Sequence, residues 1–139
     1  MDYSRLNASQ IDQLWELQKD YKAEIGEGQP GEQDHSRLLN AIEKRQIVFY
    51  GVWSGNALIG CCSVTVGFST FDYAPSGVFE DFYIRPGYRH QGIARRLVQY
   101  AYQESGVSSL MVGCADCDVE MYHALGFCIP LGNLLAFGD

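Results

Sequence analysis

The stretch EDFYIRPGYRHQGIARRL, residues 80–97, joins two elements of secondary structure through a short basic turn. The segment Val78–Ile84 is rich in β-branched and aromatic residues and is soon followed by Pro86, which predicts a strand that ends there. Apolar residues then recur at helical spacing from about Gly92 to Ser105, and Gly106 is suited to end that helix. A glycine that follows a strand and opens a helix is typical of sites where backbone N–H groups bind an anion.

The charge around this turn opposes that of the whole chain. The net charge is −7, yet residues 82–103 contain no acid and hold four of the ten Lys and Arg residues. These are Arg85, Arg89, Arg95 and Arg96. Cations in a first helical turn oppose the helix dipole, so an anion bound there would explain them as counter-charges. The alternative is a solvated basic helix face. A basic block in an acidic protein indicates a local anion site and argues against nucleic acid or membrane partners.

Length and composition indicate one folded domain. The chain has 139 residues, of which 47% are hydrophobic and 19% charged, as in ordinary globular proteins. No apolar run approaches the roughly 20 residues that span a bilayer, and the N-terminus lacks a signal-peptide core. We therefore expect a single domain over residues 1–139 in the cytoplasm.

Five cysteines without a secretory signal predict reduced, mostly buried thiols. The spacing Cys114-x-x-Cys117 is found in zinc and redox sites, but zinc needs a second ligand pair at similar spacing. The adjacent Cys61 and Cys62 are poorly suited to supply it. No metal site is predicted.

The order of the expected elements defines the fold class. Strands are expected at Tyr3–Leu6, Ile47–Trp53, Ala57–Val66, Val78–Ile84 and Ser108–Cys114, and a loop at Gly67–Gly77. Helices are expected over about Ser9–Ile25, around Leu38–Ile42, over Gly92–Ser105, and from Asp116 to Leu125. An antiparallel start followed by strand–helix–strand–helix predicts an α/β (α+β) domain. Its central sheet should be mixed, mostly antiparallel, and flanked by about four helices.

The motif Arg89-x-x-Gly92-x-Ala94, after the strand Glu-Asp-Phe-Tyr-Ile-x-Pro, resembles the acyl-CoA-binding signature of the GNAT superfamily of N-acetyltransferases. Tyr122-His-Ala-Leu-Gly-Phe127 follows at the expected distance, and the resemblance covers nearly the whole chain. The segment EDFYIRPGYR is most similar to polyamine acetyltransferases. The resemblance implies a fold in which the fourth and fifth strands splay apart.

The resemblance also implies acetyl-CoA as cosubstrate and assigns residues to it. Backbone groups of Phe82, Tyr83 and Ile84 would bind the pantetheine arm like an added strand. Tyr122 matches the tyrosine that protonates the leaving thiolate, a role for which a phenol is suited; alternatively, it is a packed aromatic beside Val119 and Leu125. The main-chain N–H groups that would hold the pyrophosphate belong to Arg89, His90, Gln91, Gly92, Ile93, Ala94 and Arg95.

Acetyl transfer also requires a deprotonated amine, and two carboxylates lie on the strand beside the expected thioester. Strand alternation places Glu80 on the face of Val78, Phe82 and Ile84, and Asp81 on the opposite face with Phe79 and Tyr83. Either could act as a base through water and attract a cationic amine. Similarity to related members favours Glu80; otherwise Asp81 is the base, or both are structural.

Two features depart from the family pattern. The asparagine often found seven residues before the tyrosine is Ala115 here, so its contact to the cosubstrate is absent or moved to Asp116. The segment CIPLGNLLAFGD (Cys128–Asp139) is short for the last two strands and is interrupted by Pro130 and Gly132. An incomplete sheet edge predicts pairing with a second chain in a homodimer, and a bare hairpin is the alternative.

Two functions fit these residues and motifs. The first is transfer of an acetyl group from acetyl-CoA to a primary amine of a small cationic substrate, by direct attack in a ternary complex. The second is a non-catalytic acyl-CoA-binding or sensor module, because a fold does not fix a function. The acceptor wall is expected from acidic and aromatic residues, which suit a cation. These lie at Trp15, Tyr21, the loop Ile25–Gln33 with Glu27 and Glu32, and Phe68–Ser76.

Overall fold

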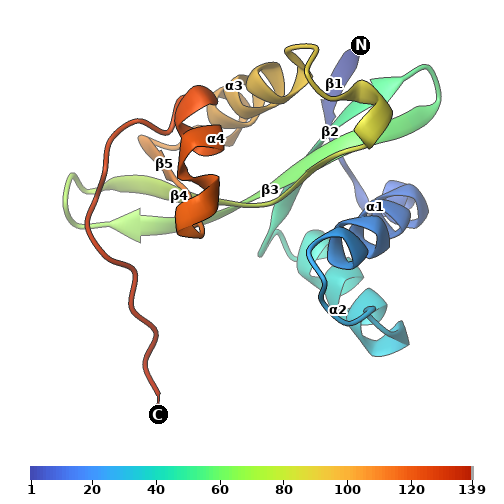
Figure 1. Cartoon of the computed structure of the whole chain (residues 1–139). Coiled ribbons are helices and arrows are strands. Elements are labelled where there is room, and N and C mark those ends of the chain that lie inside the picture. Colours follow the sequence, from blue (N-terminus) through green and yellow to red (C-terminus); the bar gives the residue numbers. More distant parts are fainter. Residues whose placement is uncertain (139) are drawn as a thin grey trace.

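The computed structural model describes residues 1–138, and these residues contain a five-stranded sheet of order β1-β2-β3-β4-β5 (Figure 1). The strands are β1 (Asp2–Arg5), β2 (Val48–Ser54), β3 (Ala57–Ser69), β4 (Ala74–Ile84) and β5 (Ser109–Met111). Neighbours from β1 to β4 are antiparallel, whereas β4 and β5 are parallel. Parallel pairing requires a crossover, which the intervening helix supplies. The predicted mixed, mostly antiparallel sheet is confirmed.

Four α-helices cover the sheet in the part of the chain that is described. They are α1 (Ile11–Glu24), α2 (Glu32–Glu43), α3 (Ile93–Ser105) and α4 (Val119–Ala124). Short 3₁₀ turns lie at Ala8–Gln10, Pro86–Tyr88 and Asp116–Asp118. Helices α1 and α2 lie on one face of the sheet, and α3 and α4 on the other (Figure 1). None of these helices is long and apolar enough to cross a membrane.

Each face of the sheet has its own buried core. Leu14 and Leu17 of α1 pack with Phe49 and Cys61 on the α1/α2 face. Leu97 and Ala101 of α3 pack with other sheet residues on the α3/α4 face, which include Tyr50, Cys62, Val64 and Phe79. Because both faces are covered, β2 and β3 are apolar along most of their length instead of alternating with polar residues.

Strands β4 and β5 separate after a short paired segment, as predicted. Their pairing runs from Ser76 opposite Ser109 to Val78 opposite Met111, while β4 continues to Ile84. Gly77 allows the close approach at the paired end, because a Cβ there would lie 3.0–3.1 Å from side-chain atoms of three neighbours. Residues 79–84 of β4 therefore have no strand of the described chain along their β5 side.

Three predictions about the second half of the chain are wrong. The expected loop Gly67–Gly77 belongs mostly to a hairpin, because β3 extends to Ser69 and β4 begins at Ala74. Strand β5 ends at Met111 instead of Cys114. The C-terminal tail, residues 128–138, contains no strand, in line with its interruption by Pro130 and Gly132, and it does not form the hairpin given as the alternative. Its large apolar side chains are mostly exposed, Phe137 fully so, and the homodimer stays a prediction.

Candidate active site

The turn before α3 is open and has the geometry of an anion site. Gly92 is the N-cap of α3 with φ +80°, and His90 is also left-handed with φ +62°. No side chain caps the helix, and the N–H of Arg96 is the first to reach back, 3.3 Å from the carbonyl oxygen of Gly92. A Cβ at Gly92 would meet no atom within 4 Å. The first N–H groups of α3 therefore have no intrahelical or side-chain partner, and the space beside Gly92 is open, which fits a bound phosphate.

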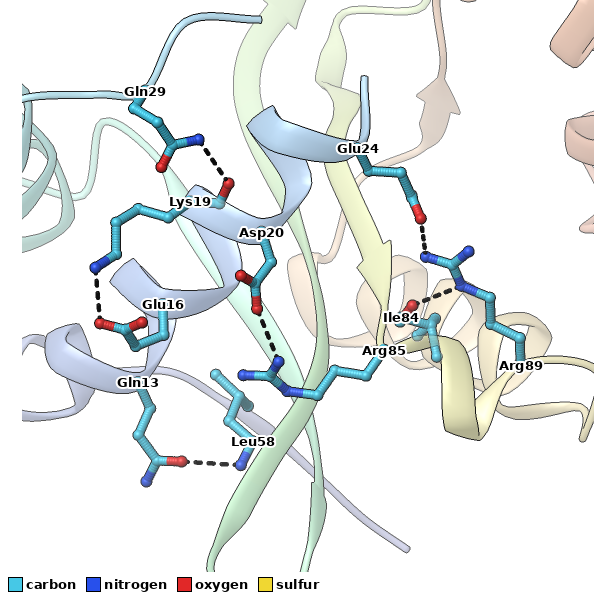
Figure 2. Close-up of polar contacts among 10 residues, drawn as sticks. All are labelled: Gln13, Glu16, Lys19, Asp20, Glu24, Gln29, Leu58, Ile84, Arg85 and Arg89. Carbon is cyan, nitrogen blue, oxygen red and sulfur yellow. Dashed lines mark hydrogen bonds and ion pairs between the residues drawn. The ribbon is translucent and has the colours of Figure 1, made fainter. Parts of the chain in front are cut away.

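Two arginines of the basic cluster join this turn to α1 (Figure 2). Arg85 Nη1 lies 2.8 Å from Asp20 Oδ2, and Arg89 Nη2 lies 2.7 Å from Glu24 Oε1. Arg89 Nε also donates to the carbonyl oxygen of Ile84 at 2.7 Å, and its guanidinium stands over the Tyr83 ring. The Arg89 side chain is thus held by α1 and by the end of β4.

A third arginine stabilises α4. Arg95 Nη1 donates to the carbonyl oxygen of Ala124 at 2.8 Å, at the C-terminal end of that helix, where a cation is favourable. Arg85, Arg89 and Arg95 therefore have protein partners. Arg96 is exposed and makes no hydrogen bond or ion pair through its side chain among residues 1–138. Arg96 and the backbone amides are the groups that this turn leaves open to an anion.

Tyr122 lies on α4 beside the unpaired stretch of β4. Its ring centroid is 6.3 Å from that of Phe82 and 5.9 Å from that of Phe127. Burial raises the pKa of Tyr122 to about 12, with smaller contributions from Tyr21, Asp118 and Cys114. The hydroxyl consequently stays protonated at neutral pH, as a proton donor must. The ring also packs as an aromatic residue of the α3/α4 face, so both sequence interpretations of Tyr122 fit the structure.

A β-bulge in β4 overturns the predicted faces of the two carboxylates. Ser63 pairs with Glu80 and Cys61 with Tyr83, so two residues of β4 lie opposite one residue of β3. The extra residue shifts the alternation of side chains along β4. Phe79 was expected on the same face as Tyr83, but it lies with Phe82 on the α3/α4 face, whereas Tyr83 lies on the α1/α2 face.

The bulge also brings both carboxylates near α1. Burial raises the pKa of Tyr21 on α1, and the charges of Asp81, Glu27 and Glu80 raise it further. Tyr21 packs edge-on to Tyr83, with ring centroids 6.2 Å apart. The prediction that Glu80 and Asp81 diverge to opposite faces is therefore wrong.

Tyr21 and Tyr122 approach the same part of β4 from α1 and α4. Tyr21 was expected only as a residue of the acceptor wall, and its place beside both carboxylates follows from tertiary packing. Trp15, expected in the same wall, instead packs edge-on to His35 of α2 at 4.9 Å. It lines a separate hollow together with Pro30, Gly31, Glu32 and Ser36.

The cysteines are distributed differently from the prediction. Cys61 and Cys62 are buried in β3, whereas Cys114, Cys117 and Cys128 are exposed, so the thiols are not mostly buried. Sequence reasoning also missed Ser63, a buried serine of β3 that contacts Asp81. The signal that could have identified it is a single hydroxyl in the apolar run Leu58–Val64.

The splaying of β4 from β5 beside the open turn at Gly92 is the arrangement that the sequence resemblance to acyl-CoA-dependent acyltransferases implies. Residues 11–127 match the acetyltransferase (GNAT) family, and the chain belongs to that family. Its members use acetyl-CoA as cosubstrate, which confirms the predicted enzyme class and acyl donor.

Solved structures of the same fold include several acetyltransferases. A probable acetyltransferase is 20% identical with a TM-score of 0.85, over 100% of this chain and 99% of that one. An aminoglycoside acetyltransferase from an uncultured soil metagenomic sample, in complex with sisomicin, is 14% identical with a TM-score of 0.84, over 99% and 95%. A predicted acetyltransferase with acetyl-CoA from Clostridium acetobutylicum is 18% identical with a TM-score of 0.76, over 99% and 95%. No curated protein matches the chain.

Proposed function

We propose that the protein acetylates a primary amine of a small cationic acceptor, by direct attack of the amine on acetyl-CoA in a ternary complex. The observation that carries this proposal is the placement of Glu80 and Asp81 in the β4 bulge near Tyr21, with Tyr122 beside the same strand. Carboxylates that accept a proton and a phenol that donates one are the two groups that acetyl transfer to an amine uses.

The residues for the cosubstrate are those around the splayed edge and the open turn. Acetyl-CoA supplies a thioester whose carbonyl carbon accepts the amine. The unpaired edge of Phe82, Tyr83 and Ile84 would bind the pantetheine arm through backbone groups. The amides from Arg89 to Arg95, centred on Gly92, would hold the pyrophosphate, since the space above that turn is open.

The proposed proton path separates two roles. Glu80, which is exposed, takes a proton from the attacking ammonium group through water. The neutral amine then attacks the thioester carbonyl carbon. As the new C–N bond forms and the C–S bond breaks, the nitrogen loses a second proton to solvent, and Tyr122 donates its proton to the leaving thiolate and recovers one from solvent. The raised pKa of Tyr122 keeps it in the donating form.

A cationic acceptor fits the charge around Tyr21. Beyond the effect of burial, the charges of Asp81, Glu27 and Glu80 raise the pKa of Tyr21, whereas Lys22 lowers it. Lys22 lies over the Tyr21 ring and pairs with Glu27 at 3.1 Å, so Asp81 and Glu80 are the carboxylates left to attract an amine cation. The sequence resemblance favours a polyamine, and an aminoglycoside acetyltransferase is among the proteins of similar structure. Polyamines and aminoglycosides share the feature that matters here, which is several amino groups on one small molecule.

The test is release of free CoA thiol from acetyl-CoA in the presence of spermidine, sisomicin, lysine or a short peptide with a free N-terminus. We expect turnover with at least one polycationic amine and weaker turnover with lysine. Binding of CoA without thiol release for any of these amines would contradict catalysis and favour the acyl-CoA-binding or sensor module.

A further inference from the structure

Ser63 is a polar residue in an otherwise apolar part of β3. Its side chain is fully buried, between Cys62 and Val64 in the sequence. A buried hydroxyl needs a hydrogen-bond partner, and Ser63 Oγ donates to Asp81 Oδ2 at 2.7 Å. A carboxylate of the candidate active site thus receives a hydrogen bond from the interior of the sheet.

The backbone of Asp81 is held in an uncommon conformation. Its φ is +52°, within the left-handed region that few residues other than glycine adopt. The thiol of Cys61 lies 3.7 Å from the Asp81 carbonyl oxygen and donates to it. Outliers of this kind persist where the surrounding structure enforces them, and bulges redirect side chains. The bulge and Ser63 together fix the Asp81 side chain on the side of Tyr21.

Glu80, one residue earlier, is held differently. It is exposed, and none of the hydrogen bonds or ion pairs among residues 1–138 involves its carboxylate. One carboxylate of the pair is therefore oriented, and the other is free to move and exchange protons with water.

We propose that Ser63 is a positioning residue that orients Asp81, so that the second oxygen of Asp81 receives the ammonium group of the acceptor while Glu80 acts as the base. This inference rests on the proposed function. An ammonium bound to an oriented carboxylate is placed before reaction, which lowers the entropic part of the barrier. Binding of the amine then depends on Ser63 only through Asp81.

The test is a pair of double-mutant cycles with whichever amine of the panel has the highest kcat/KM. Ser63→Ala removes a hydrogen bond to a charged group, and we expect the KM of the amine to rise about 10-fold with a smaller change in kcat. In an Asp81→Asn background, Ser63→Ala should have no further effect on kcat/KM. In a Glu80→Gln background, Ser63→Ala should lower kcat/KM by the same factor as it does in the unmodified protein.

Matched variants separate positioning from general damage to the sheet. Ser4→Ala also removes a hydrogen-bonded hydroxyl from the sheet, which accepts from Trp53 Nε1 at 2.9 Å, and should leave kcat/KM unchanged. Ser63→Thr keeps the hydroxyl and should restore most of the activity. If Ser63→Ala does not fold, Ser63→Cys, which keeps the volume with a weaker donor, replaces it in both cycles.

The proposal is overturned if Ser63→Ala lowers kcat/KM by the same factor in the Asp81→Asn background as in the Glu80→Gln background. It is also overturned if Ser63→Ala changes kcat and leaves the KM of the amine unaltered. Failure of the proposed function has a different signature, because the unmodified protein would then acetylate no amine of the panel.

Discussion

Replacement of Gly92 by Ala tests whether the open turn binds the phosphates of CoA. A left-handed backbone costs a residue with a Cβ about 1–2 kcal/mol. No neighbour lies within 4 Å of the added Cβ, so this backbone term is the whole expected loss of stability. For a chain of 139 residues each kcal/mol corresponds to about 3.4 °C in Tm, which gives a loss of about 3–7 °C.

The effect on CoA binding is the informative part. At 100 times its Kd, CoA should stabilise the unmodified protein by about 2.7 kcal/mol, or about 9 °C. A methyl group over the amides should weaken binding about tenfold. The same CoA concentration then adds about 1.4 kcal/mol, or about 5 °C. Thermal unfolding with and without CoA measures both quantities.

Two other glycines supply the controls. Gly106 ends the same helix with φ +67° and no atom within 4 Å of an added Cβ, so Gly106→Ala should cost similar stability and keep the full CoA shift. Gly87 is equally open but lacks a positive φ, so Gly87→Ala should change stability little. Equal CoA shifts for Gly92→Ala and Gly106→Ala would refute the assignment of the phosphates to this turn.

The remaining predictions concern the ionisable groups. Tyr122→Phe keeps the ring contacts and should lower kcat about 100- to 10,000-fold in steady-state assays, while the Kd for CoA measured by calorimetry stays constant; full turnover would show that another group protonates the thiolate. Glu80→Gln should lose most activity at low pH, where the amine is protonated, and regain part of it at high pH; a profile parallel to that of the unmodified protein would exclude Glu80 as the base. Because the pKa of Tyr122 is raised in the folded state, its contribution to stability is complete below about pH 10 and is lost as the pH rises toward about 12. Urea unfolding between pH 9 and 12 should therefore show a shallower loss for Tyr122→Phe than for the unmodified protein, and an equal slope would contradict the raised pKa.

In the second half of the chain, local signals in the sequence predicted where helices begin and end. They did not predict the contacts between residues far apart in the sequence. Helix α3 begins and ends where Gly92 and Gly106 indicate, because both boundaries depend on backbone conformation within a few residues. The β4 bulge could not be predicted, since it depends on the register against β3, and Ser63 and Asp81 are 18 residues apart. The partners of Arg85 and Arg89 lie 65 residues away on α1 for the same reason.

The C-terminal tail shows a second reason why parts of the fold could not be predicted from the sequence. The family pattern places its last two strands in this segment, but the segment is short, Pro130 and Gly132 interrupt it, and no neighbouring strand of the described chain pairs with it. A strand needs a partner for its backbone groups, so a family pattern alone does not determine whether the segment forms one.

The ion pairs of Arg85 and Arg89 would couple the two proposed substrate sites thermodynamically. They connect α1, which carries Tyr21, to the turn that leads into α3. A ligand at one site that strengthens or weakens these pairs would change the affinity of the other site for its ligand. Such coupling is reciprocal, so each ligand changes the affinity for the other by the same factor. Partly exposed pairs contribute about 0.2–1 kcal/mol each, so the loss or gain of both pairs on CoA binding would change the affinity for the amine by about 30-fold at most. Added salt screens the pairs, and the cooperativity between the two substrates therefore falls as ionic strength rises.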